Sequence, residues 1–146
     1  MKVTLAADAI MYHVGLKSFL FIKRGRPPFR GMWAIPGGAV EKGERMHEAA
    51  RREMEEETGI EFIRGCKFLS YYDAPDRDPR NRVISFVFMF NVDGNFKAGD
   101  DAAEIKAFNR NETRALINRD ELAFDHGAIM RDALRKLFPT RTACPV

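Results

Sequence analysis

Apolar residues early in the chain either form short unbroken runs or alternate with polar ones, which is the pattern of β-strands. Residues 3–14 are rich in apolar and β-compatible types and predict a first strand. Residues 19–22, Phe-Leu-Phe-Ile, form a continuous apolar run, which indicates a strand buried on both faces. The same signals predict further strands at residues 32–35, 62–72, 83–92 and 105–108.

Two segments are predicted to be helices, and residues 111–117 to form a helical turn or two. Residues 45–58 precede Gly59, a residue type that often ends helices in the left-handed conformation. A last helix is expected to begin at Asp125, a favoured N-cap, and to end before Pro139. Its apolar face consists of Ile129, Met130, Ala133, Leu134, Leu137 and Phe138.

The order of these segments favours an α/β fold. Strands lie on both sides of a central helix and a second helix follows, so we expect a mixed sheet covered by helices. The chain has 146 residues, the usual length of one domain, and we expect a single domain over residues 1–146. An apolar content of 45% supports a complete core.

One face of the predicted helix 45–58 changes in character along its length. It begins with Met46, Ala49 and Ala50, which suit a core. Residues three and four apart are neighbours on a helix, so the same face continues with three carboxylates. These are Glu53, Glu56 and Glu57. Carboxylates there require compensation, and a divalent cation is the leading interpretation. A solvated face with salt bridges is the alternative.

The spacing of glycine, acid and arginine in this region matches a known family. Residues 38–60 fit the pattern G-x5-E-x7-R-E-U-x-E-E-x-G-U, where U is an aliphatic or similar residue. This is the signature of the Nudix hydrolases, which the chain resembles at every position. The matching residues are Gly38, Glu44, Arg52, Glu53, Met54, Glu56, Glu57, Gly59 and Ile60. The resemblance implies a Nudix-type α/β/α sandwich with a mixed sheet.

The resemblance also implies a metal site. It places Mg²⁺, or Mn²⁺ in its stead, at Glu53, Glu56 and Glu57, helped by the carbonyl of Gly37. Magnesium binds few protein carboxylates, keeps several waters and is completed by substrate phosphates. Such an ion neutralises phosphate charge, lowers the pKa of bound water and orients attack on phosphorus. The implied reaction is therefore hydrolysis of a nucleoside diphosphate linked to another group.

Three further residues are expected to assist this chemistry. By resemblance, Arg52 orients a neighbouring glutamate from a different side of the helix, and Glu44 ties the preceding loop to the helix. A general base is also needed. Asp100, Asp101 and Glu104 form an acidic cluster between two predicted strands, and Glu104 is the favoured base. The alternative for this cluster is an ordinary turn with exposed acids.

Three further stretches resemble one branch of the family, the ADP-ribose pyrophosphatases. They are RGRPPFRGMWAIPGG at residues 24–38, DRDPRNRVIS at residues 76–85, and GDDA followed by LAFDH. This resemblance implies that the substrate is ADP-ribose and the products are AMP and ribose 5-phosphate. The Asp125-His126 pair in the last stretch is interpreted as a helix cap rather than a catalytic pair.

Arginines gather in two of these stretches, and arginine side chains suit phosphate oxygens. Trp33 could supply a face for adenine. The alternative is that Trp33 is a packing residue and that the arginines are solvated loop charges. The predicted substrate-binding residues are Arg26, Arg77, Arg80, Arg82, Trp33, Gly37 and Gly38.

Composition limits the range of partners. The net charge of +3 and the isoelectric point near 9 suit a phosphorylated small molecule but are too weak to indicate nucleic acid. No apolar run reaches the length of a membrane span, so we expect a cytoplasmic protein without membrane contact. Resemblance to the family also suggests a homodimer.

Two alternatives to the ADP-ribose pyrophosphatase interpretation stay open. One is a MutT-type nucleoside triphosphate pyrophosphatase acting on compounds such as 8-oxo-dGTP, which shares the box and differs in the base pocket. The other is a non-catalytic module that binds ADP-ribose.

Overall fold

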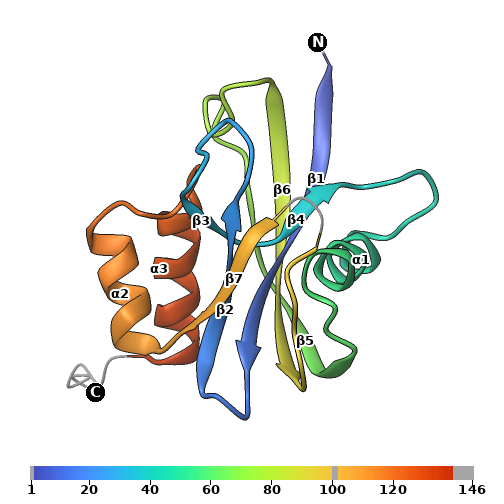
Figure 1. Cartoon of the computed structure of the whole chain (residues 1–146). Helices are drawn as coiled ribbons and strands as arrows, with labels where there is room; N and C mark the ends of the chain where they lie inside the picture. Colours follow the sequence, from blue (N-terminus) through green and yellow to red (C-terminus); the bar gives the residue numbers. More distant parts are fainter. Residues whose placement is uncertain (1, 100–101, 140–146) are drawn as a thin grey trace, which may run out of the picture.

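The computed structural model describes residues 2–99 and 102–139 (Figure 1). Strands and helices lie along this part of the chain largely where the apolar pattern predicts them. The strands are β1 (Val3–His13), β2 (Ser18–Arg24), β3 (Trp33–Ala34), β4 (Gly37–Ala39), β5 (Phe62–Tyr72), β6 (Arg82–Asp93) and β7 (Ala102–Phe108). The helices are α1 (Met46–Thr58), α2 (Arg110–Asn118) and α3 (His126–Leu137).

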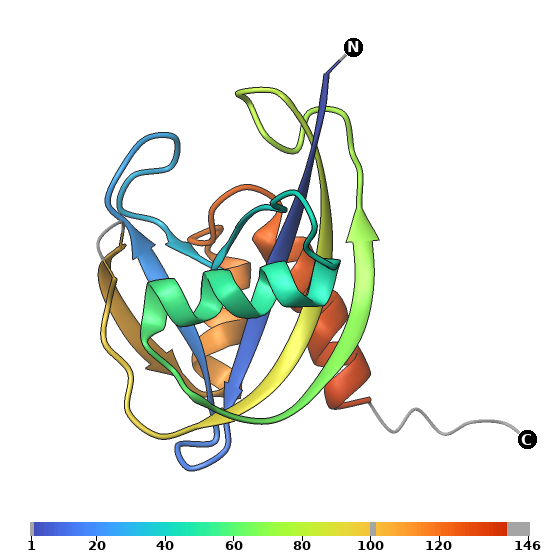
Figure 2. The same ribbon diagram turned by 90° about the vertical axis from the view of Figure 1, so that its right-hand side faces the viewer.

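The strands form one mixed sheet. Its order is β3-β2-β1-β6-β5, with β4 paired to β1 and β7 paired to β2. The β1–β6 pair is parallel and the other strand pairs are antiparallel. Helix α1 covers one face of the sheet, and α2 and α3 cover the other (Figures 1 and 2). The expected α/β/α sandwich with a mixed sheet is therefore confirmed.

Strand β1 supplies side chains to the cores on both faces of the sheet. Successive residues of a strand point to opposite faces, and both sets are apolar here. Ala7, Ala9 and Met11 join the core under α1, whereas Ile10 joins the core under α2 and α3. This double burial explains why the first strand appears in the sequence as a nearly continuous apolar run.

The edge of β1 is divided between two partners. Residues 11–13 pair with β2, and residues 6–8 pair with β4. Gly37–Ala39 forms the short strand β4, which is not among the strands predicted from the sequence. Beyond residue 20, β2 turns away from β1 and pairs with β3 on that edge, while β7 pairs along the other edge of β2 from Phe19 to Arg24. This divergence leaves space at the end of the sheet near β4.

Helix α1 buries a narrower face than the sequence indicated. Its buried residues are Ala49, Ala50, Met54 and Thr58, and Ile60 follows them into the core. Glu53 and Glu57 are half-buried and Glu56 is exposed. The three carboxylates thus flank the core face rather than continue it. The helix ends as expected at Gly59, which has a φ of 68°.

Among the helices of residues 2–99 and 102–139, none is long and apolar enough to cross a membrane.

Met54 is fully buried under α1, and we expect its truncation to be costly. A Met54→Ala substitution should lower the free energy of unfolding by about 2–5 kcal/mol, because it removes buried methylenes and leaves a cavity. Urea unfolding measures this change. Glu55→Ala is a suitable control, since Glu55 is exposed and loses only an exposed ion pair with Arg51. Equal destabilisation by both substitutions would contradict the packing described for α1.

Candidate active site

Arg52 of α1 connects several acids next to the helix. Its Nε donates to Glu44 Oε2 at 2.7 Å and its Nη2 donates to Glu44 Oε1 at 3.0 Å. Its Nη1 donates to Glu53 Oε1 at 2.8 Å, and its Nη2 also reaches the carbonyl of Ala39 at 3.1 Å. The hydrogen bonds from Arg52 hold the pKa of Glu44 below its usual value. Arg52 thereby links the loop before α1, the helix and β4.

Two glycines of β4 form the surface against which the α1 carboxylates lie. The Glu53 carboxylate packs so closely on Gly38 that a Cβ at position 38 would overlap it. Glu57 accepts a hydrogen bond from the Gly37 N–H at 3.1 Å. Partial burial raises the pKa of Glu53, against the opposing effect of Arg52. Glycine is therefore required at position 38 by close approach rather than by a special backbone conformation.

The donor atoms of Glu53, Glu56 and Glu57 suit a hard divalent cation, since all are carboxylate oxygens on one side of α1. Arg52 contacts two of these residues, Glu53 at 2.8 Å and Glu56 at 3.4 Å. With the side chains so arranged, no three His, Cys, Asp or Glu residues in the described part of the chain converge on one point. The residue types thus fit the predicted ion. In the described side-chain conformations, however, Glu53 and Glu56 contact Arg52, and Glu57 contacts the Gly37 N–H.

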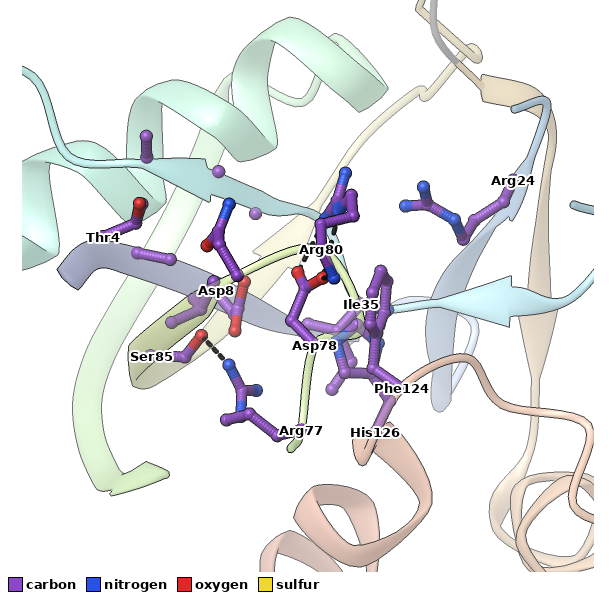
Figure 3. A pocket seen from close by; sticks show the side chains of 16 residues that line it. Thr4, Asp8, Arg24, Ile35, Arg77, Asp78, Arg80, Ser85, Phe124 and His126 are labelled. Atoms are coloured by element: carbon purple, nitrogen blue, oxygen red, sulfur yellow. Dashed lines mark hydrogen bonds and ion pairs between the residues drawn. The ribbon is translucent and has the colours of Figure 1, made fainter. Parts of the chain in front are cut away.

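A cavity of about 370 Å³ lies on the other side of the same two glycines (Figure 3). Its walls come from β1, β2, β4, the loop before β6, the start of β6 and the segment that leads into α3. Gly37 and Gly38 form part of its lining, so the cavity and the carboxylates of α1 share one wall. Charged residues in the lining are Asp8, Arg24, Arg77, Asp78 and Arg80.

Arg77 is buried beside this cavity, and its side chain donates hydrogen bonds to neighbouring side chains of the fold. Its Nε and Nη2 donate to the two carboxylate oxygens of Asp125 at 2.9 and 2.8 Å. Its Nη1 donates to Ser85 Oγ at 2.7 Å. These bonds use three of the five N–H groups of the guanidinium, and substrate binding by Arg77 stays a prediction. Asp125 occupies the N-cap position of α3 without making the expected side-chain cap, because it faces Arg77.

Asp8 is a site residue that the sequence reasoning missed. Its side chain lines the cavity and is 6% exposed, and its Oδ2 has no hydrogen-bond partner. Burial raises the pKa of Asp8 to about 7, against the opposing effects of the Arg77 charge and the Ser85 hydroxyl. A Cβ at position 37 would overlap its carboxylate. The available signal was a lone acid inside the apolar run of the first strand.

The segment before α3 supplies two rings to the cavity. His126 is buried, and its Nδ1 accepts a hydrogen bond from the Ile35 N–H at 3.0 Å. Phe124 has a φ of 54°, a left-handed conformation that is costly for a residue with a side chain. The guanidinium carbons of Arg24 and Arg80 lie 4.9 and 5.5 Å from the centre of its ring.

The remaining predicted site residues divide into two groups. Arg80, Gly37 and Gly38 line the cavity, and Arg80 also pairs with Asp78 at 2.8 Å. Trp33 instead packs edge-on against Phe108, with ring centres 5.0 Å apart, and is partly buried against the core. Two arginines lie elsewhere: Arg82 donates to the carbonyl of Asp73, and Arg26 is in the exposed loop after β2.

The predicted general base is not in the expected loop. Glu104 is exposed within β7, where it lies opposite Lys23 of β2. Its two acidic neighbours, Asp100 and Asp101, lie outside the described residues. Catalysis by Glu104 stays a prediction.

The fold and the arrangement of Arg52 with its acids define the class of this protein. The NUDIX domain family matches residues 2–137, and the chain belongs to this family.

More specific similarities concern proteins that are longer than this chain. It is 48% identical over 117 residues to the ADP-ribose pyrophosphatase of Methanocaldococcus jannaschii, covering 80% of this chain and 65% of that protein. It is 29% identical over 137 residues to the ADPR responsive transcriptional repressor NtrR of Acinetobacter baylyi. This match covers 91% of this chain and 54% of the repressor. A bifunctional NMN adenylyltransferase/ADP ribose pyrophosphatase from Francisella tularensis, complexed with AMP and a Mn ion, superposes with a TM-score of 0.79. That pair is 28% identical, and the match covers 92% of this chain and 42% of the other. The chain therefore spans less than two thirds of each relative.

The buried His126 makes the stability of the fold depend on pH. Burial lowers its pKa from 6.5 to about 4, helped by Arg77 and Arg24 and opposed by Asp125. Between these two pH values the unfolded chain binds a proton that the folded chain does not. The contribution of neutral His126 to the free energy of unfolding is therefore fully present above pH 6.5. It is lost as the pH falls toward 4.

We expect a His126→Gln substitution to remove this dependence while keeping an acceptor for the Ile35 N–H. The stability advantage of the wild type over His126→Gln should shrink by up to about 3 kcal/mol between pH 6.5 and 4. Urea unfolding of both proteins across this range measures the difference. A difference that stays constant with pH would show that His126 is not buried in its neutral form.

Proposed function

We propose that this protein is a magnesium-dependent pyrophosphohydrolase that converts ADP-ribose to AMP and ribose 5-phosphate. The observation that carries the proposal is the shared wall of Gly37 and Gly38, with carboxylates of α1 on one side and an arginine-containing cavity on the other. A substrate bound in the cavity with its pyrophosphate at this wall lies beside those carboxylates. The 48% identity to an ADP-ribose pyrophosphatase supports the choice of substrate.

Glu53, Glu56 and Glu57 would hold the magnesium ion, and the carbonyl of Gly37 remains the proposed fourth protein ligand. Their oxygens suit Mn²⁺ as well, and the Francisella relative was crystallised with that ion. Binding would exchange the contacts of Glu53 and Glu56 with Arg52 for contacts with the cation. When bound, the ion supplies charge neutralisation at the phosphates and lowers the pKa of a coordinated water.

The chain's own residues would position the other reacting groups. Before the ion binds, Arg52 would keep Glu53 against β4 through its hydrogen bond to that carboxylate, and its two bonds to Glu44 hold Arg52 in place. Arg80 lines the cavity and remains a proposed phosphate contact. Glu104 remains the proposed general base, because it is exposed and lies on β7 opposite Lys23, the residue next to Arg24.

A second candidate function is ligand binding without turnover. It is supported by the similarity to a repressor that responds to ADPR, which extends over 91% of this chain. Every position of the acid-bearing motif, from Gly38 to Ile60, nevertheless carries the residue type that the hydrolase signature requires. We therefore favour catalysis over sensing.

A substrate panel tests the proposed reaction. The protein should be incubated with magnesium and each of ADP-ribose, 8-oxo-dGTP, dinucleoside polyphosphates and NADH, and the products should be separated by chromatography. We expect the highest kcat/KM for ADP-ribose, with AMP and ribose 5-phosphate as products. A higher kcat/KM for a nucleoside triphosphate would instead support the MutT-type alternative. Tight binding of ADP-ribose without turnover, with any divalent ion, would support the sensor.

Substitutions on α1 test the proposed metal ligands. Glu56→Gln and Glu57→Gln should each lower kcat/KM by about 100-fold or more, because each removes a charged ligand for the cation. Both proteins should still fold, since neither side chain belongs to the buried face of α1. Glu55→Gln is the matched control, because Glu55 is exposed and pairs with Arg51. Full activity in Glu56→Gln and Glu57→Gln would rule out these carboxylates as ligands.

A further inference from the structure

We propose that the cavity binds a ribose 5-phosphate unit of the substrate, with Asp8 accepting hydrogen bonds from the ribose hydroxyls. Arg24 and Arg80 would contact the attached phosphate. The inference rests on the proposed function in one respect, namely that the substrate contains ribose 5-phosphate units. It assigns a recognition role to Asp8, which lies outside the acid-bearing motif of residues 38–60.

The unpartnered oxygen of Asp8 is the first step of the argument. Oδ2 is buried and accepts no hydrogen bond, although a buried carboxylate oxygen without a partner is costly. The nearby Arg77 guanidinium stabilises the carboxylate through its charge, but it donates to Asp125 and Ser85 and gives Oδ2 no hydrogen bond. Because the Asp8 side chain lines the cavity, a donor on a bound molecule can supply the absent hydrogen bond. Ribose hydroxyls are such donors, and carboxylates bind them in other nucleotide sites.

The phosphate end of the unit is placed by two arginines. Arg24 donates its Nε to the carbonyl of Pro28 at 2.7 Å, and no carboxylate of the described residues forms a salt bridge with it. Arg80 lies close enough to help burial lower the pKa of Arg24. Only Arg80 of the two has a carboxylate partner, Asp78. Two adjacent guanidiniums with one paired acid leave a positive charge that suits a phosphate.

The walls of the cavity favour a sugar over a nucleobase. Among the described residues, Phe124 is the one Phe, Tyr or Trp in the lining. Its ring is already contacted by Arg24 and Arg80, and Phe29 packs edge-on against it with ring centres 4.8 Å apart. A base would have to displace one of these groups in order to stack. The lining also includes Thr4, Ser85 and Asn81, whose polar groups match hydroxyls.

The shared wall gives the unit a direction. Asp8 packs on Gly37, and the same glycine donates its N–H to Glu57 on the α1 side. Arg24 is near enough to Glu57 for its pKa to be influenced by that carboxylate. A ribose on Asp8 with its phosphate at Arg24 therefore extends toward the proposed metal ligands, where the pyrophosphate is to be cleaved.

Binding of monophosphates tests this assignment without requiring turnover. Calorimetric titrations should compare ribose 5-phosphate with 2-deoxyribose 5-phosphate, and AMP with 2′-deoxy-AMP. We expect the wild type to bind one ribose compound about 10- to 100-fold more tightly than its deoxy counterpart, because the deoxy form leaves the Asp8 oxygen unpaired. The pair that shows this preference identifies whether the terminal ribose or the adenosine ribose lies in the cavity.

Three substitutions separate recognition from structure. Asp8→Asn should reduce the preference to less than about threefold without lowering the melting temperature, because a buried amide costs less than a buried carboxylate. Arg24→Gln should weaken both members of the preferred pair equally and leave their ratio unchanged. Asp132→Asn is the matched control, since this acid accepts a hydrogen bond from Tyr72 on the exposed side of α3. It should bind like the wild type.

Several results would overturn the assignment. They are absence of binding by all four monophosphates, no preference in the wild type, and an unchanged preference in Asp8→Asn. None of these depends on hydrolysis, so the inference and the proposed function can fail separately. If ADP-ribose is hydrolysed and Asp8→Asn keeps the wild-type preference, the function stands and Asp8 is not the recognition residue.

Discussion

The site depends on the close approach of two carboxylates to β4 from its two sides. Successive residues of a strand face opposite ways, and here the absent side chains of Gly37 and Gly38 leave room on both. Asp8 occupies the space beside Gly37, and Glu53 occupies the space beside Gly38. A side chain at either position would push apart β1 and β4, or β4 and α1. The cavity and the acid-bearing helix are neighbours because this wall is one backbone thick.

Two arginines make this concentration of acids tolerable. Arg52 binds Glu44 and Glu53 on the α1 side, and Arg77 binds Asp125 beside Asp8 on the other side. Buried carboxylates are stable only when charge and hydrogen bonds compensate them. The two arginines differ in exposure, since the side chain of Arg77 is 5% exposed and that of Arg52 is 23% exposed. Arg77 therefore belongs to the framework, whereas the partners of Arg52 remain close to solvent and available to a cation.

Two of the four non-glycine residues with positive φ in the described part of the chain lie on the cavity side. Phe124 adopts a left-handed backbone conformation, and Phe29, which packs against it, has a φ of 62°. Such conformations persist where surrounding contacts enforce them, and they are frequent at ligand sites. Here they accompany an aromatic ring in the cavity wall that is contacted by two guanidiniums. A rigid arginine pair is suited to a multiply charged ligand, which agrees with the proposed pyrophosphate substrate.

The sequence by itself determined the features that depend on local spacing. The strands, α1 with its Gly59 end, and the grouping of Glu53, Glu56 and Glu57 follow from periods of two and of three to four residues. Tertiary structure alone decided the partners of the arginines, because Arg77 binds Asp125, 48 positions away. It also made β4 a strand, packed Trp33 against Phe108 at the edge of the core, and placed Asp8 against Gly37. Side chains of the same type can have different roles because their contact partners come from distant segments. Local sequence patterns do not specify such long-range contacts.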